Sequence, residues 1–337
     1  MMKKGKLLTA SLLAFTVLAA GCSNSPAPAA GDKGASSPKA AAYPTKAVSI
    51  VVPFSAGDIS DLATRAFSEF AGGALGQSVV VVNKEGGGGS VGHAEVSKAT
   101  ADGYTLLTGS SGAMGIKPYT ANVGYTPDDF KPIGQLVELP FSIISNKNAA
   151  FKTLKEFIEY AKNNPGKVKY ASPGPGTSNH IVMETLAKKY GLKLVHVPYS
   201  GANDAVSVVL GGHVDAAIVV ASQVVPQQKA GEVNVLGVTS PKKYEFMPDV
   251  PTFGEQGYEL DASVWFGIFA PKNTPDDITK VLIDTMKKSS EDPKLKETWK
   301  KLSITPSYIG PDELKAKIAK ESKSNLEIIK ELGLEKK

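Results

Sequence analysis

Residues 48–61, VSIVVPFSAGDISD, combine three signals that decide the fold. Val48–Val52 is a short β-branched run of the kind that forms a buried strand. The loop after it is rich in Gly, Ser and Asp, and an amphipathic pattern then continues to Phe70, which predicts a helix. A strand, a small-residue loop and a helix in this order form the repeating unit of an α/β fold.

The same unit recurs along the chain. It is found at Tyr104–Thr108 with GSSGAMG, at Val168–Ala171 with SPGPGTSNH and a helix to Tyr190, at Leu194–Val197 with PYSGAND and a helix to Leu210, and at Val214–Val220 with ASQ and a helix to Lys229. This alternation predicts α/β lobes with largely parallel sheets. Later in the chain, Thr274 and Pro275 precede two acids, which predicts a helix capped by Thr274 with Pro275 as its first residue.

Two apolar extended runs interrupt the alternation, Leu136–Ser145 and Ser263–Ala270. A body built from one continuous and one discontinuous segment needs two crossings between its lobes, and these runs can supply them. We therefore expect lobe I at 43–141 plus 266–337 and lobe II at 142–265. The length of 337 residues suits two small domains.

The N-terminus carries a targeting signal. Three lysines precede an apolar run, Leu7–Ala20, which ends in LAAGC. Residues 1–21 resemble a bacterial lipoprotein signal peptide, and the run is shorter than the ~20 residues that cross a bilayer, so we expect cleavage. The resemblance implies that Cys22 is lipidated and anchors the mature chain to the lipid bilayer on the outer side of a bacterial membrane; an ordinary secretory signal with an incidental cysteine is the alternative. Residues 22–42, rich in Ala, Ser, Pro and Gly, predict a flexible tether.

The composition excludes several classes of protein. A single cysteine forms neither an internal disulfide nor a thiolate metal cluster. Loss of the signal, with three lysines and no acid, takes the net charge from +5 to +2, and the basic residues are spread along the chain, so we expect no nucleic-acid partner. The histidines show no metal-ligand spacing beyond His180 and Glu184, so neither a metal nor a cofactor is expected.

The loops of the recurring unit form the candidate site. In doubly wound sheets ligands bind at the carboxyl ends of the strands, where these loops emerge. The loops offer backbone N–H groups, hydroxyls and helix N-termini, which bind anions without Lys or Arg. Any single hydroxyl here has helix capping as its ordinary role. The convergence of five such loops on one cleft is therefore what indicates a binding site. The only arginine, Arg65, lies about one turn into the first helix, where we expect a surface ion pair and no ligand clamp.

Two motif matches fall in the glycine-rich residues 86–92, GGGGSVG, and both have weak support. Residues 87–92 fit G-x-G-x-x-G, but residues 83–86 separate them from the strand Val79–Val82, and no acid follows about 20 residues later, so we expect a glycine turn. Residues 88–92 fit G-x-S-x-G. An extracytoplasmic serine hydrolase with Ser90 as nucleophile, and His180 and Asp102 as nominal partners, is therefore an alternative function.

From Tyr43 onward the chain resembles the solute-binding proteins of tripartite tricarboxylate transporters, also called Bug receptors. The resemblance rests on YPTKAVSIVVPFSAGDISDLATR, LGQSVVVVNKEGGGGSVG, ADGYTLLTGSSG, NNPGKVKYASPGPGTSNH, HVPYSGANDAV, VLGGHVDAA, LGVTSPKKYEFMPDVPTFGEQGY and VWFGIFAPKNTPDD, in this order. It implies an α/β, two-lobed fold like that of periplasmic binding proteins (Venus flytrap, type II) with two crossover strands. It also implies a monomeric receptor, not an enzyme, that captures a small carboxylate outside the cytoplasm and hands it to membrane permease subunits.

The resemblance further implies that lobe I holds one ligand carboxylate and that lobe II contacts the remainder. The matching residues are Phe54, Ser55, Ala56, Gly57, Asp58, Ile59, Ser60, Asp61, Ser110, Ser111, Gly112, Ala113, Ser172, Gly174, Gly176, Thr177, Ser178, His180 and Tyr199.

Two departures from the family pattern bear on the ligand. Asp58 follows Gly57 where the family often has Gly-Gly; we expect Asp58 to cap the helix, and pairing with a ligand amine is the alternative. Val219 stands where many relatives carry an acid able to meet an amino group, which favours a di- or tricarboxylate or an aromatic carboxylate over an amino acid. A degenerate receptor used for sensing is a further alternative function.

Overall fold

The computed structural model of this chain describes residues 43–336. The predicted signal segment 1–21, the predicted lipidation site Cys22 and the predicted tether to residue 42 lie outside the described residues. The strands are β1 (Val48–Val52), β2 (Val79–Asn83), β3 (Thr105–Ser110), β4 (Phe130–Asn146), β5 (Lys169–Ser172), β6 (Val195–Pro198), β7 (Ala216–Val220), β8 (Val233–Val238), β9 (Ser263–Pro271) and β10 (Pro306–Ile309).

The helices cover both faces of the sheet. They are α1 (Ile59–Leu75), α2 (Ser90–Val96), α3 (Ser111–Gly115), α4 (Lys117–Thr120), α5 (Leu154–Asn163), α6 (Ser178–Tyr190), α7 (Ala202–Leu210), α8 (Val225–Lys229), α9 (Asp276–Glu291), α10 (Pro293–Lys301) and α11 (Pro311–Leu332). Short 3₁₀ turns are η1 (Gly87–Gly89), η2 (Pro127–Asp129), η3 (Ala221–Val224) and η4 (Gly254–Gln256).

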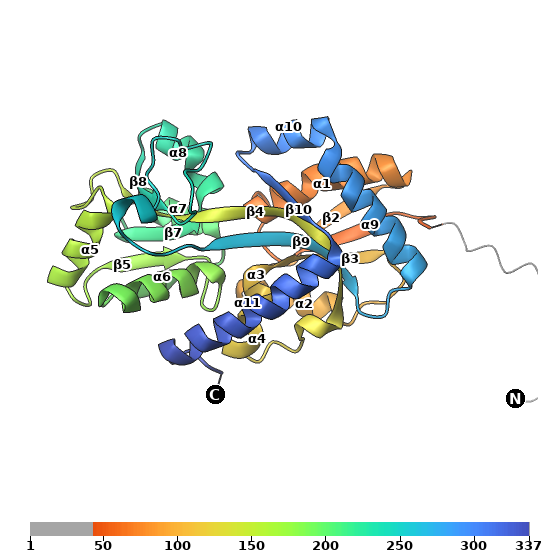
Figure 1. Ribbon diagram of the computed structural model, residues 1–337, viewed down its shortest axis with the longest axis horizontal. Helices are drawn as coiled ribbons and strands as arrows, with labels where there is room; N and C mark the ends of the chain where they lie inside the picture. The colour runs from red at the N-terminus through yellow and green to blue at the C-terminus, as the bar shows by residue number, and fades with distance from the viewer. Residues whose placement is uncertain (1–42, 337) are drawn as a thin grey trace, which may run out of the picture. The chain divides into compact units, whose positions relative to one another are not determined.

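One long strand joins two halves of a single sheet. The strand order is β2-β1-β3-β9-β4-β7-β5-β6, and β10 and β8 also pair with β4. Residues 130–140 of β4 pair with β9, whereas residues 141–146 pair with β7 and β8. Figure 1 shows β4 and β9 running side by side across the middle. We call the part around β1, β2, β3, β9 and β10 the first half, and the part around β5, β6, β7 and β8 the second half.

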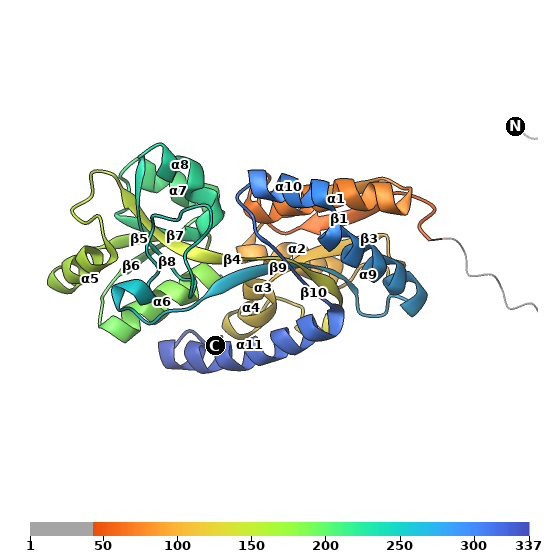
Figure 2. The ribbon, with the colours of Figure 1, turned by 45° about the horizontal axis from the view of Figure 1, so that its top comes forward.

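The sheet as a whole is mixed, although the strands of the recurring unit pair in parallel as predicted. Strands β1, β2 and β3 are parallel to one another, as are β5, β6 and β7. The pairs that involve β4 or β9 are antiparallel. The reason is connectivity. Strand β4 takes the chain out of the first half and β9 brings it back, so the two strands run in opposite directions. Figure 2 shows α5, α6, α7 and α8 around the second half and α1, α2, α3, α9 and α10 around the first.

The first unit folds as its sequence predicts. The β1 strand is buried almost throughout, and Asp58 caps α1 by accepting a hydrogen bond from the Ser60 amide. Helix α1 ends at Gly76, which adopts the left-handed conformation (φ 67°) that glycine tolerates best. The start of α9 differs from the expectation: Pro275 is its N-cap, no side chain caps the helix, and the Thr274 hydroxyl donates to the Pro271 carbonyl.

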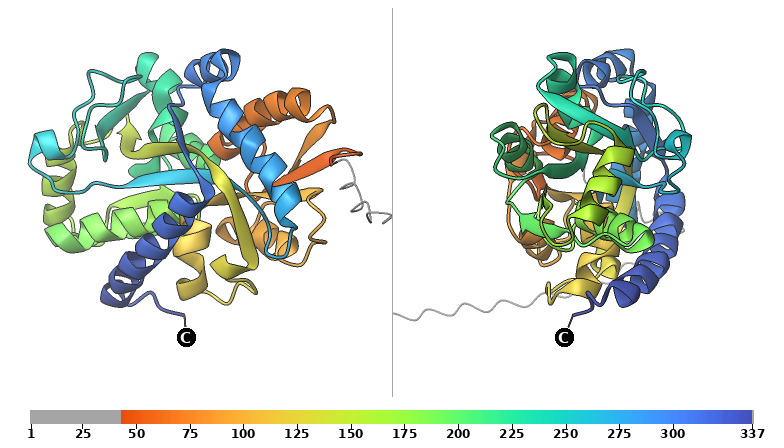
Figure 3. Two further views of the ribbon diagram at one scale, coloured as in Figure 1. Left: turned by 45° about the vertical axis from the view of Figure 1, so that its right-hand side comes forward. Right: turned by 90° about the vertical axis from the view of Figure 1, so that its left-hand side faces the viewer.

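The C-terminal helix α11 contacts both halves. It packs on β4 and α3 and also on α6. Buried Ile116, Ile181 and Ile329 meet where α4, α6 and α11 adjoin. Figure 3 shows α11 along one side of the strands. Among residues 43–336, none of the helices combines the length and the apolar character that a membrane crossing needs.

Candidate functional site

A small cavity of about 40 Å³ lies between the two halves. It opens at the carboxyl ends of β1, β3, β5 and β7, where the sequence places the small-residue loops. The lining residues are Phe54, Asp58, Ile59, Gly88, Ser110, Gly112, Ala113, Pro173, Thr177, Ser178, Asn179, Ala202, Val220, Gln223, Val264 and Phe266.

The first half supplies one wall from the start of α1. Asp58 is buried, and its Oδ1 accepts from the amide and the hydroxyl of Ser60, both at 3.1 Å. Burial is the main cause that raises the pKa of Asp58 above its ordinary value. The ring of Phe54 packs edge-on against Phe266 of β9 and makes this wall partly apolar.

A second part of this wall comes from the end of β3. The Ser110 hydroxyl accepts from the Ala113 amide at 3.3 Å and caps the short helix α3. Capping at Ala113 leaves the earlier amides of this turn, Ser111 and Gly112, without an acceptor inside the helix. The loop therefore exposes backbone donors beside a hydroxyl, next to the lining residues of the second half.

The second half contributes the starts of two longer helices. Thr177 caps α6 by accepting from the His180 amide, and Ser178 and Asn179 begin the helix at the cavity. Ala202 is the first residue of α7. The first turn of a helix carries unsatisfied N–H donors and a partial positive charge, so these two helix starts favour an anion between them.

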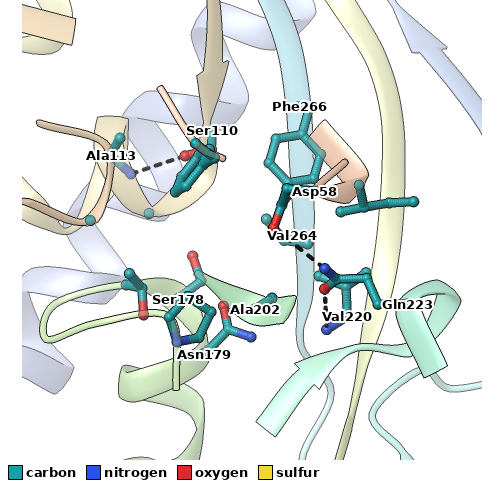
Figure 4. A pocket seen from close by; sticks show the side chains of 16 residues that line it. Asp58, Ser110, Ala113, Ser178, Asn179, Ala202, Val220, Gln223, Val264 and Phe266 are labelled. Carbon is teal, nitrogen blue, oxygen red and sulfur yellow. Dashed lines mark hydrogen bonds between the residues drawn. The ribbon is translucent and has the colours of Figure 1, made fainter. Parts of the chain in front are cut away.

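Three hydrogen bonds tie the halves together around the cavity. Gln223 Nε2 donates to Asp58 Oδ2 at 3.4 Å, and the hydroxyls of Ser111 and Ser178 are 3.1 Å apart. Lys117 Nζ donates to the Pro175 carbonyl at 2.6 Å. Figure 4 shows Asp58 and Gln223 toward one side of the cavity and Ser110, Ala113 and Ser178 toward the other. The two halves are thus in direct contact around the cavity.

The family model described as "Tripartite tricarboxylate transporter family receptor" (TctC) matches residues 63–334. This chain belongs to that family. A relative from Cupriavidus necator, the UPF0065 protein in gbd 5'region, is 32% identical over 337 residues, covering 99% of each chain. BugT of Bordetella pertussis is 30% identical over 299 residues, covering 86% of this chain and 90% of the relative.

Solved structures agree with the family assignment. The periplasmic binding protein BugD is 34% identical with a TM-score of 0.82, covering 88% of this chain and 100% of that one. R. palustris Rpa4515 with adipate is 26% identical with a TM-score of 0.83, covering 86% and 98%. The predictions of the family and of the two-lobed binding-protein fold are confirmed. The chain is a TctC-family solute-binding protein of the extracytoplasmic space, and its family is one of receptors rather than enzymes.

The structure brings part of the predicted set to the cavity of this TctC receptor. The predicted residues that line it are Phe54, Asp58, Ile59, Ser110, Gly112, Ala113, Thr177 and Ser178. The predicted residues that do not line it are Ser55, Ala56, Gly57, Ser60, Asp61, Ser111, Ser172, Gly174, Gly176, His180 and Tyr199. The binding roles of this second group stay a prediction, and several of these side chains make hydrogen bonds with other parts of the protein.

In the first half, Asp61 is turned toward the arginine. Its carboxylate accepts from Arg65 Nε at 2.9 Å and from the Gly57 amide at 2.9 Å. Burial opposes ionisation, but the hydrogen bonds from Arg65, Gly57 and Asn83 hold the pKa of Asp61 below its ordinary value. The expected ion pair of Arg65 is present, although its partner is a buried carboxylate, so the pair is only half on the surface. Arg65 does not line the cavity, and Ser55 donates to Glu85.

In the second half, two of the predicted residues, His180 and Ser172, contact the ring of His196. His180 stacks on His196 with ring centroids 4.2 Å apart, and its Nδ1 accepts from the Gly176 amide. The Ser172 hydroxyl lies 2.7 Å from His196 Nε2. Burial lowers the pKa of His180 and of His196 to about 4, so both rings are neutral near pH 7. His180 thereby holds the loop 173–177 through its hydrogen bond with the Gly176 amide.

Several lining residues were not predicted from the sequence. Gln223 and Asn179 lie in two of the recurring loops, ASQ and SPGPGTSNH, but neither was singled out as a binding residue. Gly88 belongs to the run interpreted as a glycine turn. The turn is present, since Gly86, Gly87, Gly88 and Gly89 all have positive φ, and it places Gly88 at the cavity. A Cβ on Gly88 would lie 2.8 Å from Lys117 Cε, which indicates how closely the turn is packed.

Val219 faces the core and not the cavity, contrary to the expectation from the sequence. Val219 is fully buried in a cluster with Val206 and Val209 of α7, whereas its neighbour Val220 lines the cavity. Successive residues of a strand face opposite sides, so an acid at 219 would not meet the ligand here. The acid that lines the cavity is Asp58.

The Ser90 alternative finds no support in the hydrogen bonds of the described residues. The Ser90 hydroxyl donates to the Gly87 carbonyl. Asp102 accepts from the Tyr104 amide, and His180 accepts from the Gly176 amide, so both nominal partners are engaged elsewhere. Within residues 43–336 no group of three or more His, Cys, Asp or Glu side chains is arranged to hold a metal ion.

Proposed function

We propose that this TctC-family receptor captures a small carboxylate and delivers it to the membrane permease subunits of a tripartite transporter. The observation that carries the proposal is the position of the α6 and α7 starts at one cavity between the two halves. Their amide donors and partial positive charge suit a carboxylate that has no side-chain cation to pair with. The adipate held by the R. palustris relative supports the same ligand class.

The walls suit the carbon skeleton of such an acid. Phe54, Phe266, Ile59 and Val264 give the cavity an apolar surface, as is usual for small-molecule sites. Di- and tricarboxylates and aromatic carboxylates are the candidate ligands from the sequence. Since Val219 no longer separates them from amino acids, both groups belong in the test.

The finer parts of the proposal concern attachment and motion. We infer a chain anchored through a lipid on Cys22, with residues 22–42 as a tether and the body working as a monomer. Lobe II (142–265) closes on lobe I (43–141 plus 266–337) around the ligand and presents the closed form to the permease. The protein has no catalytic cycle in this proposal, so the bound acid leaves unchanged.

A thermal-shift screen of residues 43–337 tests the proposal. The panel contains citrate, succinate, adipate, tartrate, terephthalate, aspartate and glutamate. A ligand present at 100 times its Kd adds about 2.7 kcal/mol to the free energy of unfolding, which raises Tm by several degrees. Silence across a broad panel of acids would count against carboxylate capture. Turnover of an ester that depends on Ser90 would favour the hydrolase instead.

A variant pair links any binding to the cavity. Ala202→Asp places a carboxylate at the first position of α7, where an acid favours the helix but repels a bound anion. Asn203→Asp adds the same charge at the next residue, which is exposed and does not line the cavity. We expect Ala202→Asp to abolish the thermal shift and Asn203→Asp to preserve it. Equal loss in both variants would indicate a site elsewhere.

A further inference from the structure

Asp58 is an unusual residue to find in an anion site. It is the only ionisable side chain among the cavity-lining residues of the described chain, and it is 6% exposed. Within residues 43–336 no lysine, arginine or histidine forms a salt bridge with it. A buried carboxylate without a counter-charge is costly, so its presence here needs an explanation.

Helix capping explains only one of its two oxygens. Oδ1 accepts both hydrogen bonds from Ser60, as an N-cap should. Oδ2 has one long contact, with Gln223 Nε2 at 3.4 Å. Ser, Thr and Asn cap a helix as well as Asp does, so capping does not require the negative charge.

The nearby basic groups are committed to other partners. Arg65 Nε binds Asp61 at 2.9 Å, and Lys117 Nζ donates to the Pro175 carbonyl. Burial leaves the pKa of Asp58 raised even with the donors from Ser60 and Gln223 in place, which means that the protein itself does not compensate the charge. A cation that arrives with the ligand would compensate it.

The two kinds of charge lie on different sides of the cavity. Asp58 and Gln223 are on one side, and Ser178, at the positive end of α6, is on the other (Figure 4). Gln223 is held in place because its Oε1 accepts from the Val220 amide at 3.3 Å, which directs its Nε2 to Asp58. A ligand with a negative group at one end and a positive group at the other would match both sides.

We propose that Asp58 determines specificity by binding a protonated nitrogen of the ligand, so that the cavity takes carboxylates that carry an amine in preference to those that do not. This inference rests on the proposed function, because the carboxylate of the ligand lies at the α6 and α7 starts. Asp58 Oδ2 and the ammonium form a charge-assisted hydrogen bond away from water. An acid that places a second carboxylate beside Asp58 is disfavoured by repulsion between like charges.

Matched pairs of acids test the proposal by isothermal titration calorimetry on residues 43–337. The pairs are aspartate with succinate, glutamate with glutarate, and 4-aminobutyrate with butyrate, which differ by one amine. For at least one pair we expect the wild type to bind the amine-bearing acid about 30-fold or more tighter, the usual consequence of removing one partner of a buried charge pair. Asp58→Asn keeps the cap and the shape but removes the charge, so it should abolish or reverse this preference.

Asp204→Asn is the matched control, since Asp204 is an exposed acid in the first turn of α7 that does not line the cavity. It should keep the wild-type preference. Circular dichroism and Tm verify folding, and Asp58→Ser, which also caps, replaces Asp58→Asn if that variant is unfolded. Equal binding of both members of every pair, or a preference that survives in Asp58→Asn, would overturn the inference while leaving carboxylate capture intact. Failure of every acid to bind would overturn both proposals.

Discussion

Gly112 lies where the two halves touch, and a methyl group there should act as a wedge. Its backbone has an ordinary negative φ, so Gly112→Ala introduces no conformational strain. The added Cβ would lie 2.9 Å from the Ser178 amide nitrogen, closer than real Cβ contacts come, and 3.0 Å from its hydroxyl, which is also tight. Because the nearer atom belongs to the backbone of α6, the halves must separate to relieve the contact.

The size of the effect follows from the cost of overpacking. Overpacking a close contact costs about 1–3 kcal/mol. This cost applies only when the halves are together, so it lowers the population of the closed form, and the apparent affinity should fall about 5- to 150-fold. The unfolding midpoint of the ligand-free protein should change little, since separation of the halves relieves the contact.

Calorimetry with the tightest acid of the panel measures the change in Kd. Gly73→Ala is the control: Gly73 is exposed in α1, and a Cβ there meets no atom within 4 Å. The control should bind as the wild type does and gain up to about 1 kcal/mol of stability from helix propensity. Wild-type affinity in Gly112→Ala would refute the idea that the contact with Ser178 forms part of the ligand-binding conformation.

Three further predictions concern stability and attachment. His93 is fully buried, and burial lowers its pKa to about 4, so its contribution to stability is complete above pH 6.5 and is lost as the pH falls toward 4. In urea unfolding, the free energy of His93→Gln should therefore vary with pH by about 3 kcal/mol less than that of the wild type over this interval. Identical pH profiles for the two proteins would contradict this prediction. Gly267→Ala would place a Cβ 2.8 Å from the Gly134 carbonyl oxygen of β4, so it should cost about 1–3 kcal/mol and lower Tm, whereas an unchanged Tm would show that the strands adjust freely. Cys22→Ser in the full chain should move the protein from the membrane fraction to the soluble fraction after export, and unchanged fractionation would argue against lipid attachment.

Local sequence patterns were sufficient to predict much of the sheet. The β1 strand occupies the predicted residues, and the strands predicted near 104, 168, 194 and 214 appear within two residues of the predicted starts. Such patterns show how apolar residues are spaced along a segment and hence whether it is a buried strand or a helix. They do not show whether two strands pair in parallel or antiparallel. The antiparallel pairing of β4 and β9 depends on the path of the chain and was missed for that reason.

The site was harder to predict than the strands, because a motif marks a loop but not the direction in which a side chain points. Ser172 and His180 belong to the correct loop, yet the ring of His196 turns both of them away from the cavity. Val219 and Val220 differ by one strand position and therefore face opposite sides. Gln223 meets Asp58 across 165 positions of sequence, a separation at which a single sequence gives no signal.

The place of β9 in the sheet sets the order in which the two halves can fold. By residue 238 the growing chain contains β4, β5, β6, β7 and β8, so the second half has all of its strands. Strand β3 must wait for its neighbour until residues 263–271 emerge. Until then the first half has an open edge, and an unpaired edge is a template for pairing with other chains. Export of this receptor therefore includes an interval in which its N-terminal strands are prone to aggregate, and mutations that slow the arrival or docking of β9 would lower its yield before they affect ligand binding.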